Sequence, residues 1–488
     1  MALNASGAIS LAGTTAGQSI EVELGGNGVT MISLNDTTVR TLAGVASGQI
    51  SMPINFWGKS SDAFWVAYPL TNAQGLSFLD ANTAGTRLHA CINSATTSGR
   101  YNLNLASGVA EDTYLYTMQA TSDTKNNYSF TNNIDYIATN TGSSTVTRRA
   151  WLVSYNSAGI VSQQKYNGSV SATTARMNGL RHFESQNALL FVQNIPANQQ
   201  TLGKANPSTL QPTAGLAYLG PRGFGSTPPL LTNKPIGDTY YLSGYSSTST
   251  SGIYPQHIIS HHSISISSWT SSAIASWGSD QRIGDFTEVV SSTNRWLVGT
   301  TGSGGSTPIK YGIMMKFSLD GSTKILENQT MGPLNYSILT EQALLVDSGG
   351  NIYTMGQILY GTTYLFKSDT NGNLIWSRKF VMTSSTTINT GPTSAYETSS
   401  SIIFSARDFI VKYPKDGSKL GTFTLGTRTL TITNETDPRR YVTPSNYYYA
   451  TSGVTCTPLS VAAFISDTSF TNATVTSGTQ TAFPVVNL

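Results

Sequence analysis

The feature that most constrains what this chain can fold into is an internal repeat with a period of about 50 residues. Its clearest unit is an apolar run that ends in Asp-Gly or Asn-Gly, the dipeptides that most strongly favour the tight turn of a β-hairpin. Such units stand at residues 314–321, 364–372 and 409–417, with an earlier match at 151–159. Their turn glycines, Gly321, Gly372 and Gly417, recur at nearly even steps. The repeat is therefore built from hairpins.

A second marker, a short run of β-branched and aromatic residues, precedes the hairpins and fills the gaps between these units. Seven such runs occur, and their spacing stays close to the same period. Their reference residues are Ile137, Leu190, Leu242, Leu297, Tyr353, Ile403 and Tyr449. Four short strands fill a repeat of this length, and repeats made wholly of strands are typical of a β-propeller. The sequence thus predicts an all-β fold, with a β-propeller of about seven blades over residues 121–488.

Glycines close three of these runs, at Gly244, Gly299 and Gly356. Strands crowd together near the axis of a propeller, where a residue without a side chain fits best. We therefore expect the runs to be the innermost strands of their blades, with the Asp-Gly and Asn-Gly turns in the next hairpin outward.

Composition supports this fold class and disfavours several functions. Charged residues make up 11% of the chain, against roughly 25% in ordinary globular proteins, and such a composition favours strands over long surface helices. The net charge of +3 comes without long runs of one sign, so nucleic-acid binding is not indicated. Residues 1–6 lack the pattern of a signal peptide, and no stretch is long and apolar enough to span a membrane. We expect synthesis in the cytoplasm and no membrane insertion.

Residues 61–120 fit the repeat poorly, because the interval from Trp65 to Ile137 is too long for one blade. They form either an eighth, decayed blade or the strands that complete the last blade and lock the ring, and the second interpretation is favoured. Cys91 and Cys456 are too few for a disulfide framework, and we expect plain thiols. The alternative is a bond between them, formed if a closing strand near Cys91 lies beside the blade that holds Cys456.

Part of the repeat is also similar to a known group of proteins. Residues 342–353, Gln-Ala-Leu-Leu-Val-Asp-Ser-Gly-Gly-Asn-Ile-Tyr, are followed by Lys367 and Trp376. They resemble bead-like β-propeller repeats, whose blades contain an aspartate, Gly-Asn, a strand, Gly, then Lys-x-Asp-x-x-Gly and a Trp. The resemblance covers two or three blades clearly and implies the fold, not the function.

Residues 1–60 have a different texture from the repeat. Strands are expected at residues 9–11 and 20–24, followed by one or two helical turns that Asn35 and Asp36 cap and Gly44 ends. Pro53 excludes a helix across the next segment, whose apolar side chains would pack against a neighbour. A segment this short cannot form an independent core, so we expect a partner surface to complete this module.

The same segment resembles a short module found near the N termini of tail and other virion proteins of tailed phages. The similarity covers Ser-Leu-Asn-Asp-Thr-Thr-Val-Arg-Thr-Leu-Ala-Gly-Val at 33–45, Ser-Gly-Gln-Ile-Ser-Met at 47–52 and Phe-Trp-Gly-Lys-Ser at 56–60. It departs from the usual Ser-Asn-Phe-type spacing at residues 53–55. The resemblance implies that residues 1–60 dock the chain to a virion. The residues assigned to docking are Val39, Arg40, Leu42, Ile50, Met52, Phe56 and Trp57.

Residue types that carry chemistry are scattered. His257 and His261 would face the same way on a strand, as two metal ligands do, but partly exposed structural histidines, including His262, are the favoured interpretation. Glycan hydrolysis needs two carboxylates about 5 to 9 Å apart, and the acids near turns are better explained as turn formers. Those acids are Asp238, Asp285, Glu288 and Asp347. No catalytic residue, metal site or cofactor is expected, and the protein is predicted not to be an enzyme.

Two further sets of side chains lie within the repeats. Four polar residues at hairpin tips, Asp320, Asp369, Asn371 and Asp416, offer too few oxygens for calcium, and turn formation explains them. Four tyrosines, Tyr240, Tyr241, Tyr447 and Tyr448, are candidate contacts to a glycan, since tyrosine combines an apolar face with a hydroxyl. Burial within strands is the favoured alternative for these tyrosines.

The expected function is that of a structural virion component of a tailed phage, in the tail, baseplate or a tail fibre, assembled in the host cytoplasm. Its partners would be other virion proteins and a host surface glycan, with several copies on each particle. The propeller would point outward for host adsorption or act as a spacer. The alternatives are a capsid decoration protein and a propeller glycosidase or depolymerase that acts on surface polysaccharide.

Overall fold

The structure is a computed structural model that describes most of the chain. It describes residues 3–4, 6–15, 18–24, 27–43, 45, 48–56, 64–68, 75–81, 85–93, 98–105, 108, 110–117, 126–130, 135–141, 149–156, 159–166, 177–195, 199–219, 235–248, 256–279, 282–302, 310–331, 340–357, 362–383, 395–406, 409–436, 440–442, 448–449, 455–459, 474–477 and 485–487. None of the helices in these ranges is long and apolar enough to cross a membrane.

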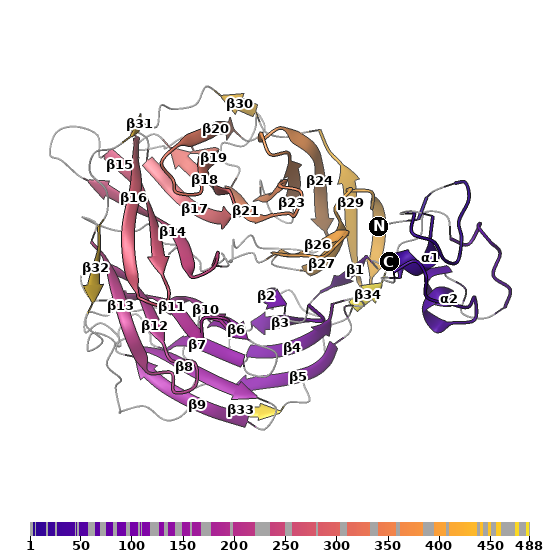
Figure 1. The fold of residues 1–488 in the computed structure, drawn as a ribbon, viewed down its shortest axis with the longest axis horizontal. Helices are drawn as coiled ribbons and strands as arrows, with labels where there is room; N and C mark the ends of the chain where they lie inside the picture. Colours follow the sequence, from indigo (N-terminus) through magenta and orange to yellow (C-terminus); the bar gives the residue numbers. More distant parts are fainter. Residues whose placement is uncertain are drawn as a thin grey trace.

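The described strands form seven antiparallel sheets of four to six strands. Figure 1 shows the sheets arranged around a ring, with the later strands of each sheet toward the rim. Consecutive sheets along the chain are neighbours in the ring, as radial packing of hairpin-built blades requires. The prediction of an all-β propeller with about seven blades is confirmed.

Six blades take their main strands from consecutive segments of the chain. Blade 1 comprises β2 (Gly75–Ala81), β3 (Arg87–Asn93), β4 (Ser98–Asn104) and β5 (Ala110–Thr117), and blade 2 comprises β6 (Asn126–Phe130), β7 (Asp135–Thr141), β8 (Arg149–Asn156) and β9 (Gly159–Tyr166). Blade 3 comprises β10 (Met177–Phe183), β11 (Ala188–Ile195), β12 (Gln199–Ala205) and β13 (Pro212–Leu219), and blade 4 comprises β14 (Thr239–Thr248), β15 (Gln256–Ser265) and β16 (Thr270–Ser279). Blade 5 comprises β17 (Arg282–Val290), β18 (Asn294–Gly302), β19 (Lys310–Ser318) and β20 (Lys324–Met331), and blade 6 comprises β21 (Thr340–Val346), β22 (Ile352–Gln357), β23 (Thr362–Ser368) and β24 (Leu374–Met382).

Blade 7 closes the ring with strands from both halves of the chain. Its local strands are β25 (Ala395–Glu397), β26 (Ser401–Ala406) and β27 (Phe409–Pro414), and β1 (Trp65–Ala67) adds a fourth. Trp65 pairs with Lys412, and Val66 pairs with Val411. The expectation of a closing strand within residues 61–120 is therefore confirmed for β1. Residues 75–117 form a blade of their own, which was the less favoured alternative for this stretch.

A C-terminal belt, which we define as strands β29 to β34, circles the ring in the direction opposite to the blades. Its strands pair in turn with the outer strands of blades 6, 5, 4, 3, 1 and 7, and Figure 1 places them along the rim. They are β29 (Arg428–Asn434), β30 (Arg440–Val442), β31 (Tyr448–Tyr449), β32 (Thr455–Leu459), β33 (Thr474–Ser477) and β34 (Val485–Asn487), with β28 (Gly421–Leu425) paired to β29.

The belt corrects two expectations. The run at Tyr449 is not a blade of its own, because β31 is the outer strand of blade 4. Cys456 lies on β32, paired with Tyr218 of blade 3, whereas Cys91 lies on β3 of blade 1, paired with Ser77. The two cysteines belong to different blades and do not meet at the ring closure.

Two of the three glycine-closed marker runs lie one strand further out than expected, whereas Gly244 lies on β14, the innermost strand of its sheet, as predicted. Gly299 and Gly356 lie on β18 and β22, the second strands of their sheets, and β17 and β21 lie inside them. The Asp-Gly and Asn-Gly turns follow the third strands, as Gly321 follows β19. The prediction of innermost strands is wrong for these two runs, because each blade begins with a further strand, β17 or β21, on the inner side.

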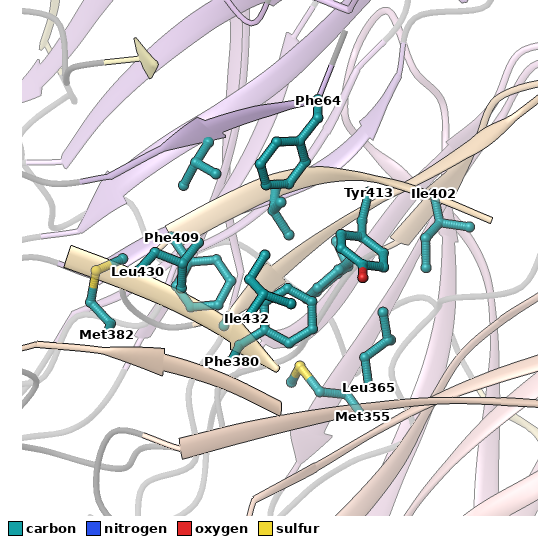
Figure 2. Close-up of a cluster of buried hydrophobic side chains, with 14 of the residues drawn as sticks. Phe64, Met355, Leu365, Phe380, Met382, Ile402, Phe409, Tyr413, Leu430 and Ile432 are labelled. Atoms are coloured by element: carbon teal, nitrogen blue, oxygen red, sulfur yellow. The ribbon is translucent and has the colours of Figure 1, made fainter. Parts of the chain in front are cut away.

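The core lies between neighbouring blades. The largest cluster joins blades 6 and 7 to the belt and contains edge-on aromatic pairs, such as Phe380 against Tyr413 with ring centroids 5.3 Å apart. Figure 2 shows Phe64 within this cluster, together with Leu430 and Ile432 of the belt strand β29. Burial of large side chains between sheets is the main stabilising contribution of this architecture.

Lysines of the repeat link one blade to the next. Each extends from the third strand of its blade to a backbone carbonyl of the following blade and lies over an aromatic ring, an arrangement that a cation–π contact supports. The three bonds run from Lys204 to Ile266 at 2.5 Å, from Lys316 to Thr370 at 2.5 Å and from Lys367 to Lys415 at 3.1 Å. The rings are Trp269, Trp296 and Tyr353.

The N-terminal residues form a small unit of turns and two helices, α1 (Ile20–Glu23) and α2 (Thr37–Ala43). The predicted strand at 20–24 is wrong, because the Ser19 hydroxyl accepts a hydrogen bond from Val22 N and caps a helical turn there. The expected helical turn after Asp36 is confirmed, since the Asp36 carbonyl accepts from Arg40 N. Figure 1 shows the unit outside the ring, on the side of β1 and β34.

Candidate functional site

The N-terminal unit has a small apolar cluster of its own, contrary to the expectation that only a partner could supply one. Its buried members are Leu3, Ile20, Val39, Leu42, Ala43 and Phe56. Val39, Leu42 and Phe56, three of the residues assigned to docking, are thus interior and not part of the surface. They hold the unit together, and any effect they have on docking acts through its shape.

The other residues assigned to docking divide into three groups. Arg40 donates to the carbonyls of Val45 and Gly48 and to Asn35 Oδ1, so it fixes the loop after α2. Ile50 and Met52 are partly buried against the apolar cluster. Trp57 lies outside the described residues.

The surface of the unit carries apolar side chains, of which the sequence pointed to Ile54 but not to Val29 or Met31. Met31 is 96% exposed, Val29 74% and Ile54 64%. The loop before Val29 and Met31 is held by the buried Glu21 carboxylate, which accepts from Asn27 N and Gly28 N. Three of the six large exposed apolar side chains found among the described residues lie in this unit, between residues 29 and 54, which makes the unit a candidate for docking.

A buried polar cluster joins blades 4 and 5. The Ser243 hydroxyl donates to Glu288 Oε1 at 2.7 Å and lies 2.8 Å from His261 Nδ1. Arg295 Nε contacts the same carboxylate oxygen at 2.8 Å. In a nucleophilic triad the histidine lies between serine and carboxylate. Here the serine lies between the other two, so its proton is already held by Glu288 and His261 donates to it.

This cluster is structural. Ser243, His261 and Arg295 are at most 1% exposed, so no substrate reaches them. Glu288 was grouped with turn acids, and that expectation is wrong, because its carboxylate neutralises the buried Arg295 guanidinium. Burial, followed by the Arg295 charge, holds the pKa of His261 well below its usual value.

The histidines considered as metal ligands are packed into the fold. His261 and His262 flank a β-bulge and are both fully buried, contrary to the expected partial exposure. Burial lowers the pKa of His262 to about 4. His257 lies on the same strand, opposite Ser247 and Ser279. Among the residues that the structure describes, no three His, Cys, Asp or Glu side chains are grouped to hold a metal ion.

Most of the turn acids are turn formers, as expected. Asp347 Oδ1 accepts from the backbone N of Gly349 and Asn351 in its own turn, whereas Asp238 accepts from Ser265 and Ser267 in the turn after β15. At the hairpin tips, Asp320, Asp369 and Asp416 accept the backbone N–H groups of Ser322, Asn371 and Ser418. Such contacts stabilise tight turns without an ion. The side chain of Asp285 lies outside the described residues.

Of the tyrosines considered for glycan contact, the structure describes the side chains of Tyr240 and Tyr241. Tyr240 is fully buried, and burial raises the pKa of its phenol. Tyr241 lies under the Arg295 guanidinium, 5.6 Å from its ring centroid. Tyr448 pairs through its backbone with Gly278, while its side chain and the whole of Tyr447 lie outside the described residues. Strand packing explains Tyr240.

One open pocket of about 460 Å³ lies on the face of the ring that carries the turns between β2 and β3, between β21 and β22 and between β25 and β26. Turns of blades 1, 6 and 7, which are neighbours in the ring (Figure 1), form its walls. Its lining residues are Gly85, Leu105, Ser348, Tyr396, Glu397, Thr398 and Ser399. Sequence reasoning missed this pocket, because its walls come from segments near opposite ends of the propeller chain.

No protein-family model matches the chain, and no curated protein matches its sequence. Among solved structures, the chain is similar to the Dos1 propeller, with 12% identity and a TM-score of 0.38 over 68% of this chain and 76% of that one. It is also similar to the Nup133 β-propeller domain of Vanderwaltozyma polyspora, with 9% identity and a TM-score of 0.36 over 76% and 97% of the two chains. For the plexin A4 extracellular region the identity is 7% and the TM-score 0.41, over 72% of this chain and about half, 51%, of that one. The fold assignment stands on the strand pairing, and no function transfers from these proteins.

Proposed function

We propose that the chain is a structural component of a tailed-phage virion, attached through its N-terminal unit, with the propeller as the outward body. The observation that carries the proposal is a small, separately packed unit at the rim whose exposed side chains include Val29, Met31 and Ile54. The resemblance of residues 33–60 to virion-docking modules supports the same role. Placement in the tail or baseplate follows from that resemblance, and a capsid position is the alternative.

Host adsorption is the role we assign to the propeller. A particle that carries several copies turns weak contacts of each copy into firm attachment. The glycosidase alternative finds no support in the acids considered for it, because Asp238, Glu288 and Asp347 are each engaged in structural hydrogen bonds.

The docking surface is tested by the double variant Met31→Asp, Ile54→Asp in the full chain. Buried apolar side chains contribute about 1.5 to 3 kcal/mol each to an interface, so we expect at least a tenfold lower content in purified particles. The matched control is Ile325→Asp, Ile375→Asp, at two half-exposed positions of the propeller. Quantitative immunoblots measure incorporation, and unchanged melting temperatures establish that both variants fold. If the Met31→Asp, Ile54→Asp variant were present in purified particles at the same level as the unchanged protein, this docking surface would be refuted.

The position of the protein on the particle is measured in a separate experiment. Immunogold electron microscopy with an antibody against residues 121–488 is expected to label the tail end. Label spread over the head would replace the tail assignment with a capsid decoration protein.

A further inference from the structure

We propose that the pocket between blades 1, 6 and 7 is a binding subsite for a neutral saccharide. This inference concerns the propeller face and does not depend on how the chain is attached to a particle. The volume of about 460 Å³ falls within the range of small-molecule sites, roughly 300 to 1,000 Å³. It accommodates one or two sugar rings, and its open shape admits the end or edge of a longer glycan.

Glu397 is held in place for hydrogen bonding. Its Oε1 accepts from Ser348 N and Ser348 Oγ, both at 2.9 Å, and from Lys415 Nζ at 2.6 Å. Within the part of the chain that the structure describes, all three contacts fall on Oε1, so Oε2 remains an acceptor for a ligand. A carboxylate fixed in this way loses little side-chain entropy on binding, which favours recognition of sugar hydroxyl groups.

Tyr396 supplies an apolar surface next to this acceptor. Its side chain is half-buried in the middle of β25, at the inner edge of blade 7, and packs partly against the apolar cluster that joins blades 7 and 1. A Cβ atom at Gly85 would lie 3.0 Å from the Tyr396 hydroxyl, so the glycine in blade 1 leaves room for this side chain. An aromatic ring beside hydroxyl and carboxylate groups matches the alternating C–H and O–H surfaces of a pyranose.

Charge narrows the class of ligand. The Glu397 carboxylate and the Lys415 ammonium form an ion pair, so the wall of the pocket has no net charge from these two groups. An anionic ligand would meet the free oxygen of Glu397, and a cationic one would compete with Lys415. The exposed Ser348 and Ser399 add small hydroxyl-bearing side chains to the lining. A neutral, polyhydroxylated ligand fits this environment best.

The experiment is saturation-transfer NMR of the full chain with glucose, galactose, mannose and N-acetylglucosamine as separate probes, and with sialic acid and glucuronic acid as anionic comparisons. We expect transfer to at least one of the four neutral sugars, with millimolar affinity. Tyr396→Ala is expected to weaken binding at least tenfold, whereas Tyr396→Phe, which keeps the ring, should stay within threefold of the parent. Ser399→Leu fills the pocket from an exposed position and should also abolish transfer without a change in melting temperature.

Three results would overturn the inference. They are absence of transfer to all four sugars, equal transfer in the Ser399→Leu variant, and tighter binding of a sialic or uronic acid than of any neutral sugar. Because binding is measured on free protein, a negative result leaves the particle-incorporation test unaffected. If the Met31→Asp, Ile54→Asp variant lost incorporation into particles but still bound the sugar, attachment to the particle and sugar binding would be shown to be separate functions.

Discussion

At the scale of single residues, buried histidines give the protein a built-in sensitivity to acid. Burial lowers the pKa of His182 and of His262 to about 4, and it holds the pKa of His261 well below its usual value. His182 also stacks on Tyr136, with ring centroids 5.0 Å apart. These imidazoles are neutral in the folded protein at pH 7, and protonation inside the fold is unfavourable.

The free energy of unfolding should therefore fall as the pH decreases from about 6.5 to about 4. In that window the unfolded chain binds protons that the folded chain does not, so stability present above pH 6.5 is lost. For His182 and His262 the loss amounts to about 2 to 3 kcal/mol each by pH 4.5. Urea unfolding at pH 7, 5.5 and 4.5 measures this loss. In the His182→Phe variant, the free energy of unfolding should fall less between pH 7 and pH 4.5, by the contribution of one histidine. Equal stability at pH 7 and pH 4.5 would contradict the burial of these side chains.

At the scale of the structural element, the turn glycines of the repeat have a second role beyond turn geometry. Gly321 has φ of +73°, and a Cβ atom there would lie 2.6 Å from the His261 ring of the preceding blade. Trp277 of that blade donates to the Gly321 carbonyl at 2.9 Å. Each of these turns therefore lies against the previous blade, which explains why the same hairpin signal recurs. The equivalent glycines Gly372 and Gly417 meet Leu326 and Arg378 in the same way.

Gly321→Ala should be much more destabilising than Gly237→Ala. Both glycines have positive φ, but a Cβ atom at Gly237 would meet nothing within 4 Å. We expect a loss of about 1 to 2 kcal/mol at Gly237 from backbone strain alone. At Gly321 the overlap with the His261 ring adds about 1 to 3 kcal/mol. Chemical denaturation of the two variants gives the comparison, and equal losses would mean that the blades do not meet at this turn.

The repeat could be found in the sequence because its signals are local. Asp320-Gly321 and the strand before it lie within a few residues of each other, and this spacing recurs from blade to blade. The blade of residues 75–117 and the strands of the belt could not be found in this way. Strands β30 to β34 are too short to carry a periodicity, and their partners can lie at the far end of the propeller chain, as Val66 does for Val486. The pocket was missed for the same reason, and the exposed Met31 because its loop is irregular.

At the scale of the whole molecule, the two ends of the propeller chain meet in one sheet. Val66 on β1 pairs with Val411 on one side and with Val486 on the other, so β1 lies between β27 and β34. The belt covers the outer edges of blades 1 and 3 to 7, where unpaired N–H and C=O groups would otherwise invite association with other chains. The belt thus serves both as a lock on the ring and as a cover for its edges.

Removal of the belt should lower both the melting temperature and the solubility of the protein. A chain that ends after residue 436 keeps β29 but loses β30 to β34, and with them the outer strands of five sheets. We expect a melting temperature at least several degrees lower, because every lost strand also uncovers an edge, and concentration-dependent aggregation through those edges. A chain that ends after residue 477 is the control, since it loses only β34. In this control chain we expect only faster amide hydrogen exchange in β1 and β27. Aggregation as severe as in the shorter chain would mean that β34 alone, and not the whole belt, protects the ring.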